Sequence, residues 1–146
     1  MRFPNLESEV MELVAVIHSD NHLGRYYTDW IDMMNRHKLF AIMTVGDMGQ
    51  AATVDLELQE AIDAAGTGAQ AIAAKAITQL TQAGGDGDDA VCIDLRAEEM
   101  TAANRYRFVR ARLDVLQAAT HAALFLFVTY DSYPPVGVTL WTEVVP

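Results

Sequence analysis

Short segments in which apolar and polar residues alternate, separated by glycine-rich turns, limit the fold of this chain more than any other feature. Residues 54–59 read Val-Asp-Leu-Glu-Leu-Gln, and residues 91–96 read Val-Cys-Ile-Asp-Leu-Arg just after the turn at residues 84–87. A period of two places one set of side chains on the core face of a sheet and the other set in water. We therefore expect a half-buried strand at each place.

Three further segments also favour strands. Residues 39–45 and 124–130 are apolar at nearly every position, which is typical of strands covered on both faces, and one covering layer could be a neighbouring subunit. In residues 105–115 the alternation changes phase after Phe108, because Tyr106 and Phe108 share one parity and the later apolar residues take the other. That change predicts a β-bulge.

Two segments also fit a helix and leave a mixed fold open. Residues 61–83 are rich in strong helix formers, and residues 106–116 have apolar side chains at helical spacing as well. Glycines at Gly66, Gly68 and residues 84–85 interrupt the first segment, and short strands between such breaks indicate a sandwich or barrel. We therefore predict an all-β fold, a β-sandwich of jelly-roll type.

No linker or low-complexity tract divides the chain, so residues 1–146 are predicted to form a single β-sandwich domain. Pro134 and Pro135 mark the end of the last long strand, and residues 138–145 are expected to form a short C-terminal strand or arm.

Composition excludes several classes of protein. One cysteine cannot form an internal disulfide, and no apolar run follows a basic N-terminal segment, so we expect intracellular synthesis. The longest apolar stretch, residues 122–128, is far shorter than the roughly 20 residues that span a membrane. Twenty acidic and ten basic side chains give a net charge of −10, which disfavours binding to nucleic acid. We expect a soluble protein without a nucleic-acid or membrane partner.

One segment resembles a metal-binding motif. Residues 17–24, Ile-His-Ser-Asp-Asn-His-Leu-Gly, are similar to the opening motif of calcineurin-like metallophosphoesterases, and Asp47 in Val-Gly-Asp matches the second motif. A two-metal site needs further ligands, but no Gly-Asn-His follows and His121 is the only later histidine. We therefore expect a polar loop between two strands at residues 17–24, with no catalytic residues and no metal site.

Other candidate sites are weaker. Asp86, Asp88 and Asp89 offer oxygen ligands for calcium, but Val91 and Ala97 stand where an EF-hand has glycine and glutamate. An acidic turn is the favoured interpretation.

The single cysteine and the individual aromatic residues do not indicate a specific functional site either. Cys92 has no neighbouring His or Lys and is expected to be a strand residue rather than a nucleophile. Trp30, Trp141, Tyr130 and Tyr133 are candidates for interface anchors, although aromatic residues in strands more often belong to the core.

From about residue 14 to residue 136 the chain resembles small virion proteins of tailed bacteriophages and prophages. The resemblance lies in the order of several segments, which are residues 28–33, 44–46, 52–61, 63–69, 75–84, 95–100 and 118–120. The chain has Asp-Ser-Tyr-Pro-Pro at residues 131–135, where an ending similar to Arg-Tyr-Gly-Pro is expected. That departure leaves the C-terminal contacts open.

The resemblance implies a structural protein rather than an enzyme. It implies a capsid decoration or cement protein on the outer surface of the head, assembled in the host cytoplasm, with the major capsid protein and other copies of itself as partners. It implies no catalytic residues and no cofactor. A head–tail connector or tail component is the alternative within this class, and a metal-dependent phosphoesterase is the distant alternative outside it.

Overall fold

A computed structural model describes residues 11–130, apart from the side chains of Asn104 and Tyr130. Within this range there is no α-helix, and the secondary structure consists of strands and three short 3-10 helices. The strands are β1 (Met11–Tyr27), β2 (Ile31–Asp32), β3 (Arg36–Met48), β4 (Thr53–Ala61), β5 (Gln70–Ala76), β6 (Leu80–Thr81), β7 (Ala90–Arg96) and β8 (Phe108–Tyr130). The 3-10 helices are η1 (Gln82–Gly84), η2 (Ala97–Glu99) and η3 (Ala103–Arg105).

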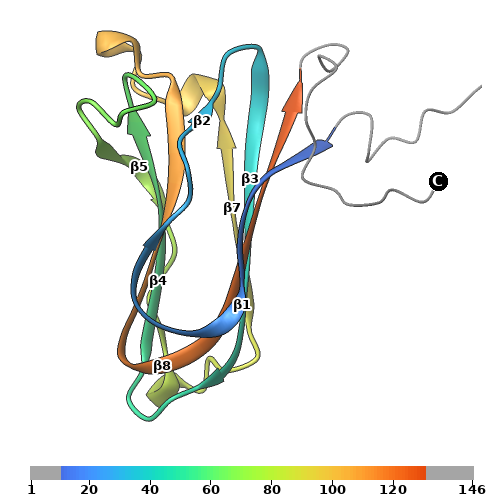
Figure 1. Cartoon of the computed structure of the whole chain (residues 1–146), viewed down its shortest axis with the longest axis vertical. Coiled ribbons are helices and arrows are strands. Elements are labelled where there is room, and N and C mark those ends of the chain that lie inside the picture. Colours follow the sequence, from blue (N-terminus) through green and yellow to red (C-terminus); the bar gives the residue numbers. More distant parts are fainter. Residues whose placement is uncertain (1–10, 131–146) are drawn as a thin grey trace, which may run out of the picture.

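The sheet is organised around the longest strand, β8, and every pairing in it is antiparallel. One edge of β8 pairs with β4 over its first half and with β3 over its second half, while the other edge pairs with β1 and β2. Strands β5 and β6 then pair with β4, and β7 pairs with β3. The long strands β1 and β8 bend in the middle, so the sheet folds over into two facing layers (Figure 1).

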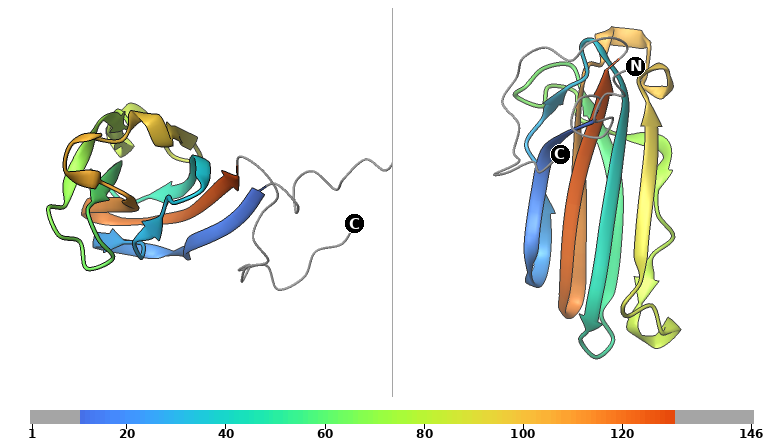
Figure 2. Two further views of the ribbon diagram at one scale, coloured as in Figure 1. Left: turned by 90° about the horizontal axis from the view of Figure 1, so that it is seen from above. Right: turned by 90° about the vertical axis from the view of Figure 1, so that its right-hand side faces the viewer.

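The result is a nearly closed, jelly-roll-like β-sandwich. The first layer holds the early part of β1, the later part of β8, β3 and β7, and the second layer holds the rest (Figures 1 and 2). At one side the layers are joined through Lys75 of β5, whose Nζ donates to the carbonyl oxygen of Asp94 in β7 at 2.6 Å and pairs with Glu99 at 2.8 Å. This bridge closes the gap between β5 and β7.

Alternating side chains from both layers fill the core, as the period of two predicts. Leu39, Leu56, Leu58, Leu113 and Leu124 are among its fully buried members. Burying one such leucine stabilises the fold by about 1.5–3 kcal/mol relative to leaving it in water. The all-β, sandwich-type prediction is confirmed.

The bend of the sheet depends on irregular backbone and on glycine. The pairing of β1 with β8 shifts register between Ile17 and Asp20 and again between His22 and Gly24, and such shifts increase bending. Gly49 packs against the bend of β8, because a Cβ at Gly49 would lie 2.6 Å from the carbonyl oxygen of Ala119. A side chain at Gly49 would push these segments apart.

Several strand predictions are confirmed. Residues 54–59 lie in β4, and residues 91–96 lie in β7. The helix-prone residues 61–83 form a turn, β5, β6 and the start of η1 instead. Gly66 and Gly68 adopt positive φ angles of 83° and 68° in that turn, which ends any helix.

Two local predictions are wrong. Residues 105–115 contain no bulge in the pairing with β4, because Phe108 to Leu116 run in continuous register; the phase change arises because β8 begins only at Phe108. Residues 17–24 are not a loop but the bent part of β1. The polar side chains of residues 18–21 are exposed where the strand turns from one layer to the other, which made the segment look like a loop.

The apolar strands 39–45 and 124–130 bury one face in the core, while Phe40, Ile42, Phe125 and Phe127 on their outer face are half-buried. The expected C-terminal strand or arm, at residues 138–145, lies outside the described residues.

Candidate interaction surface

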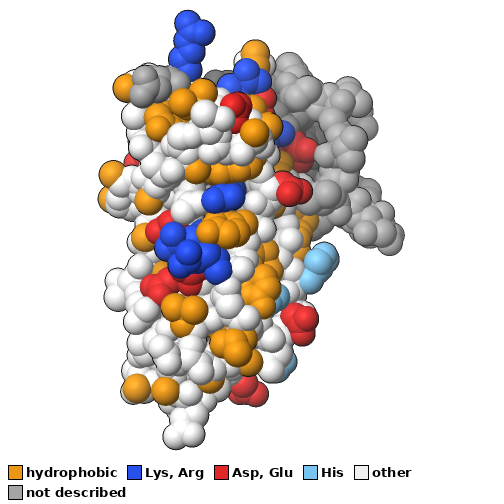
Figure 3. Space-filling view, turned by 60° about the vertical axis from the view of Figure 1, so that its left-hand side comes forward, with side chains coloured by type: hydrophobic (Ala, Val, Ile, Leu, Met, Phe, Trp, Pro, Cys, Tyr) orange, Lys and Arg blue, Asp and Glu red, His pale blue; other side chains and the backbone are white. Residues whose placement is uncertain are grey.

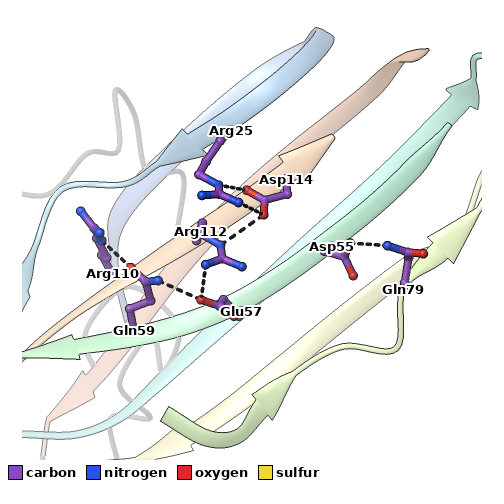
Figure 4. A network of polar contacts seen from close by, with 8 residues as sticks. All are labelled: Arg25, Asp55, Glu57, Gln59, Gln79, Arg110, Arg112 and Asp114. Carbon is purple, nitrogen blue, oxygen red and sulfur yellow. Dashed lines mark hydrogen bonds and ion pairs between the residues drawn. The ribbon is translucent and has the colours of Figure 1, made fainter. Parts of the chain in front are cut away.

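The outer face of the second layer carries a row of arginines framed by aromatic rings. We call it the arginine face and define it by residues on β1, β4 and β8 and the turn before β2, which are Arg25, Tyr27, Trp30, Glu57, Gln59, Arg110, Arg112 and Asp114. Figure 4 labels all of them except Tyr27 and Trp30, and Figure 3 shows basic side chains gathered beside hydrophobic ones. The alternation of β8 creates it, since Val109, Ala111 and Leu113 point into the core and the residues between them point outward.

A carboxylate shared by two arginines lies at the centre of the arginine face. Arg25 donates from Nε to Asp114 Oδ1 at 2.7 Å and from Nη2 to Oδ2 at 3.0 Å, a bidentate pair. Arg112 reaches Asp114 Oδ2 at 3.3 Å and Glu57 Oε1 at 2.9 Å. The hydrogen bonds from Arg25 to Asp114 raise the pKa of the Arg25 guanidinium above its usual value. Carboxylates therefore hold both guanidinium groups in place.

Arg110 is held by aromatic rings instead of a carboxylate. Its guanidinium carbon lies 4.0 Å from the ring centre of Tyr27 and 4.4 Å from that of Trp30, both within cation–π range. Its Nε donates to Gln59 Oε1 at 2.9 Å, and Gln59 in turn donates to Glu57 Oε1 at 2.8 Å. The side chain of Arg110 is thus fixed before any partner arrives.

Trp30 is itself backed by a glycine. A Cβ at Gly66 would lie 2.9 Å from Nε1 of Trp30, so only glycine allows the turn to approach the indole this closely. Just before Trp30, Thr28 links the chain to β8, because its hydroxyl accepts from the backbone N–H of Ala111 at 3.0 Å. The turn between β1 and β2 is therefore anchored at two points.

The arginine face is less acidic than the chain as a whole. Within residues 11–130 no carboxylate lies at ion-pair distance from Arg110, whereas Arg25 and Arg112 both have one. Asp55, which pairs with Asp114 across β4 and β8 on the same outer face, brings the carboxylates to three, so the three arginines make this face neutral on a chain that carries −10. Leu23 and Leu116, which are 56% and 42% exposed, add apolar surface at the bend of the same layer. Arginine and aromatic residues of this kind are typical of protein–protein contacts.

The residues of the phosphoesterase-like motif do not assemble a metal centre. Asp20 in β1 and Asp47 in β3 are exposed and lie on strands at opposite edges of β8. His22 is buried, and its Nε2 lies 3.0 Å from the carbonyl oxygen of His18. In the part of the chain that the structure describes, no three His, Cys, Asp or Glu side chains are grouped as metal ligands.

The other candidates take ordinary positions. Asp86 accepts a hydrogen bond from the backbone N–H of Thr81 at 2.7 Å, as expected of an acidic turn. Cys92 is a free, exposed cysteine on β7. Of the four aromatic candidates, Trp30 lies in the arginine face rather than in the core, and the other three side chains lie outside the described residues.

Tyr27, Arg110 and Asp114 were not predicted from the sequence to belong to a functional surface. The alternation of β8 could have placed residues 110, 112 and 114 on the outer face of the sheet. It could not have identified their partners, which come from β1 and β4. Within residues 11–130 no helix is long and apolar enough to cross a membrane. No family model matches the chain, and no curated protein is significantly similar to it. Its relation to virion proteins therefore stays a prediction from the order of its segments.

Proposed function

We propose that this protein is a structural component of a tailed-phage virion that decorates the outer surface of the capsid. The ordered sequence segments that resemble small virion proteins support the proposal, and so does the jelly-roll-like sandwich. The major capsid protein is the proposed partner, and the proposal assigns no catalytic residue, metal or cofactor to the chain.

The arginine face is the observation that carries this proposal. Arg110, Tyr27 and Trp30 belong to the residue types that dominate binding energy at interfaces, and they are fixed in advance by stacking. We expect the binding energy that one copy gains from this contact to be modest. Many copies on a repeating shell act together, because each bound copy stabilises only the assembled lattice.

A comparison of two arginine variants tests the proposed contact. Arg110→Gln removes the stacked guanidinium. Arg105→Gln removes an exposed arginine that, among the described residues, has neither a carboxylate partner nor a stacked aromatic ring. Both variants change the net charge equally, so a general electrostatic effect cancels. We expect Arg110→Gln to weaken binding to capsids lacking this protein at least about tenfold, a loss of about 1.4 kcal/mol, and Arg105→Gln to bind as the parent does.

Electron cryo-microscopy of the intact particle tests the location. The expected result is density for this chain in many copies over the head. Density confined to the portal vertex or the tail would contradict decoration and favour the connector or tail alternative.

An activity assay addresses the distant alternative. We expect no hydrolysis of a generic phosphodiester with added manganese and no change on Asp20→Ala or Asp47→Ala. Metal-dependent turnover lost in either variant would overturn the structural proposal.

A further inference from the structure

The guanidinium of Arg110 is only partly hydrogen-bonded by the chain itself. Arginine has five N–H donors, and Nε of Arg110 donates to Gln59 Oε1 at 2.9 Å. Within residues 11–130 this is the one hydrogen bond of Arg110, and no carboxylate lies at ion-pair distance from it. Arg25 and Arg112, in contrast, each direct a terminal nitrogen at a carboxylate of the chain. The two terminal nitrogens of Arg110 are therefore available to a partner.

The contacts that hold Arg110 in place do not use its terminal nitrogens. Its guanidinium carbon lies 4.0 Å from the ring centre of Tyr27 and 4.4 Å from that of Trp30, and the rings attract the cation through their π faces. Figure 4 shows Arg110 at the edge of the polar network, which it joins only through Gln59. Arg110 is half-buried and Tyr27 is 44% exposed, so a partner can reach the pair. Binding costs little conformational entropy, because the side chain of Arg110 is already ordered.

The chemistry of these donors favours a carboxylate. Two parallel N–H groups of a guanidinium match the two oxygens of a carboxylate, and such charge-assisted hydrogen bonds are about twice as strong as neutral ones. The chain makes a bidentate pair of this kind between Arg25 and Asp114, at 2.7 and 3.0 Å. Among the described residues, Arg110 is the cation of the arginine face that has no such counter-charge. One added carboxylate would complete the pairing.

The charge of the whole chain restricts the surface that presents this carboxylate. A net charge of −10 repels strongly acidic surfaces and the phosphates of nucleic acid at long range. A single acidic side chain on an otherwise neutral or basic protein surface does not meet this repulsion. The charge pattern therefore favours an isolated acidic residue over an acidic patch or a polyphosphate.

We propose that Arg110 binds one Asp or Glu side chain of a partner protein, with its terminal nitrogens on the two carboxylate oxygens and Tyr27 and Trp30 beside the pair. The inference rests on the proposed function, in which the arginine face contacts the capsid, and it names the chemical group that the face recognises there. Lysine cannot replace Arg110 in this role, because an ammonium group has no planar fork of donors and stacks poorly on aromatic rings.

An NMR titration of the full chain with a short capped peptide tests the inference without a capsid. The probe is Ala-Lys-Ala-Glu-Ala-Lys-Ala, and its control has glutamine in place of glutamate. We expect the glutamate peptide to shift the Arg110 Nε–H and Trp30 indole N–H signals saturably at low salt, and the glutamine peptide to bind at least about tenfold more weakly. The glutamine peptide is the more positive of the two, so general attraction to an acidic chain works against this result.

Two variants assign the binding to Arg110. Arg110→Lys keeps the charge and should lose the shift of the Trp30 signal. Arg105→Lys is the matched change at an exposed arginine outside the arginine face and should keep that shift. Circular dichroism establishes that both variants are folded.

Several results would overturn the inference. They are equal binding of the two peptides, no saturable shift with the glutamate peptide, an unchanged response in Arg110→Lys, and tighter binding of inorganic phosphate than of the glutamate peptide at Arg110. Capsids lacking this protein separate the two proposals. If they bind the parent and Arg110→Lys equally, the inference fails and the proposed function stands. A chain that binds the glutamate peptide through Arg110 but binds no capsids would count against the proposed function alone.

Discussion

Glu60 offers the sharpest test of how this sandwich is held together. It is fully buried, and its carboxylate accepts from the side-chain amide of Gln70 at 2.7 Å and from the backbone N–H of Thr101 at 2.9 Å. The two partners lie on β5 and on the loop between η2 and η3. Glu60 therefore ties two separate segments to the end of β4.

Glu60→Gln keeps the shape of the side chain but leaves one acceptor oxygen for two donors. One charge-assisted hydrogen bond is lost, at about 1.5–3 kcal/mol, and the new amide group faces a donor. We expect the free energy of unfolding to fall by about 2–3 kcal/mol. With a urea dependence of about 2 kcal/mol/M, the midpoint of unfolding falls by about 1–1.5 M.

Urea unfolding followed by circular dichroism measures this change, and hydrogen exchange at the Thr101 amide reports the local bond. Glu98→Gln is the control, because the Glu98 side chain is 72% exposed and its loss should change stability by less than about 0.5 kcal/mol. A Glu60→Gln protein within about 0.5 kcal/mol of the parent, with Thr101 exchanging at the parental rate, would refute the reasoning.

Three further predictions follow from packing and charge. Leu58→Ala empties part of the fully buried core and should lower the free energy of unfolding by about 2–5 kcal/mol in a urea titration. Gly49→Ala should lower the melting temperature in calorimetry, because its Cβ would lie 2.6 Å from the carbonyl oxygen of Ala119; an unchanged melting temperature would show that the bend yields easily. The hydrogen bond from Arg107 lowers the pKa of Asp32 below its usual value in the folded protein. The contribution of the Asp32–Arg107 pair to stability is therefore complete above an unfolded-state pKa of about 3.9 and disappears as the pH falls through the lower pKa of the folded protein. Asp32→Asn should therefore make the acid limb of a pH–stability curve less steep, and parallel limbs in the two proteins would contradict this.

The strands of this protein could be predicted from local pattern because a sheet has a period of two in any context. Residues 54–59 and 91–96 alternate, and both became strands. The expected core residues are buried, except Val91, which is partly buried against the core. Glycine at Gly66 and Gly68 was enough to override the helix propensity of the alanine-rich segment, since both positions require left-handed backbone.

Where the strands bend was not readable from the sequence. Residues 17–24 have the composition of a loop, but pairing with β8 keeps them in β1. The phase change near Phe108 looked like a bulge and is only the start of a strand. The deciding hydrogen bonds come from residues 115–124 in the first case and from the end of β4 in the second, and a local pattern carries no information about either segment.

The arginine face also depends partly on local sequence and partly on long-range contacts. The sequence by itself determined that Arg110, Arg112 and Asp114 point to one side of a strand, because side chains alternate. Only the tertiary structure decided that Tyr27 and Trp30 stack on Arg110 and that Arg25 pairs with Asp114. These contacts join residues more than 75 positions apart, and they form because β1 and β8 bend together and bring their outer faces into one surface.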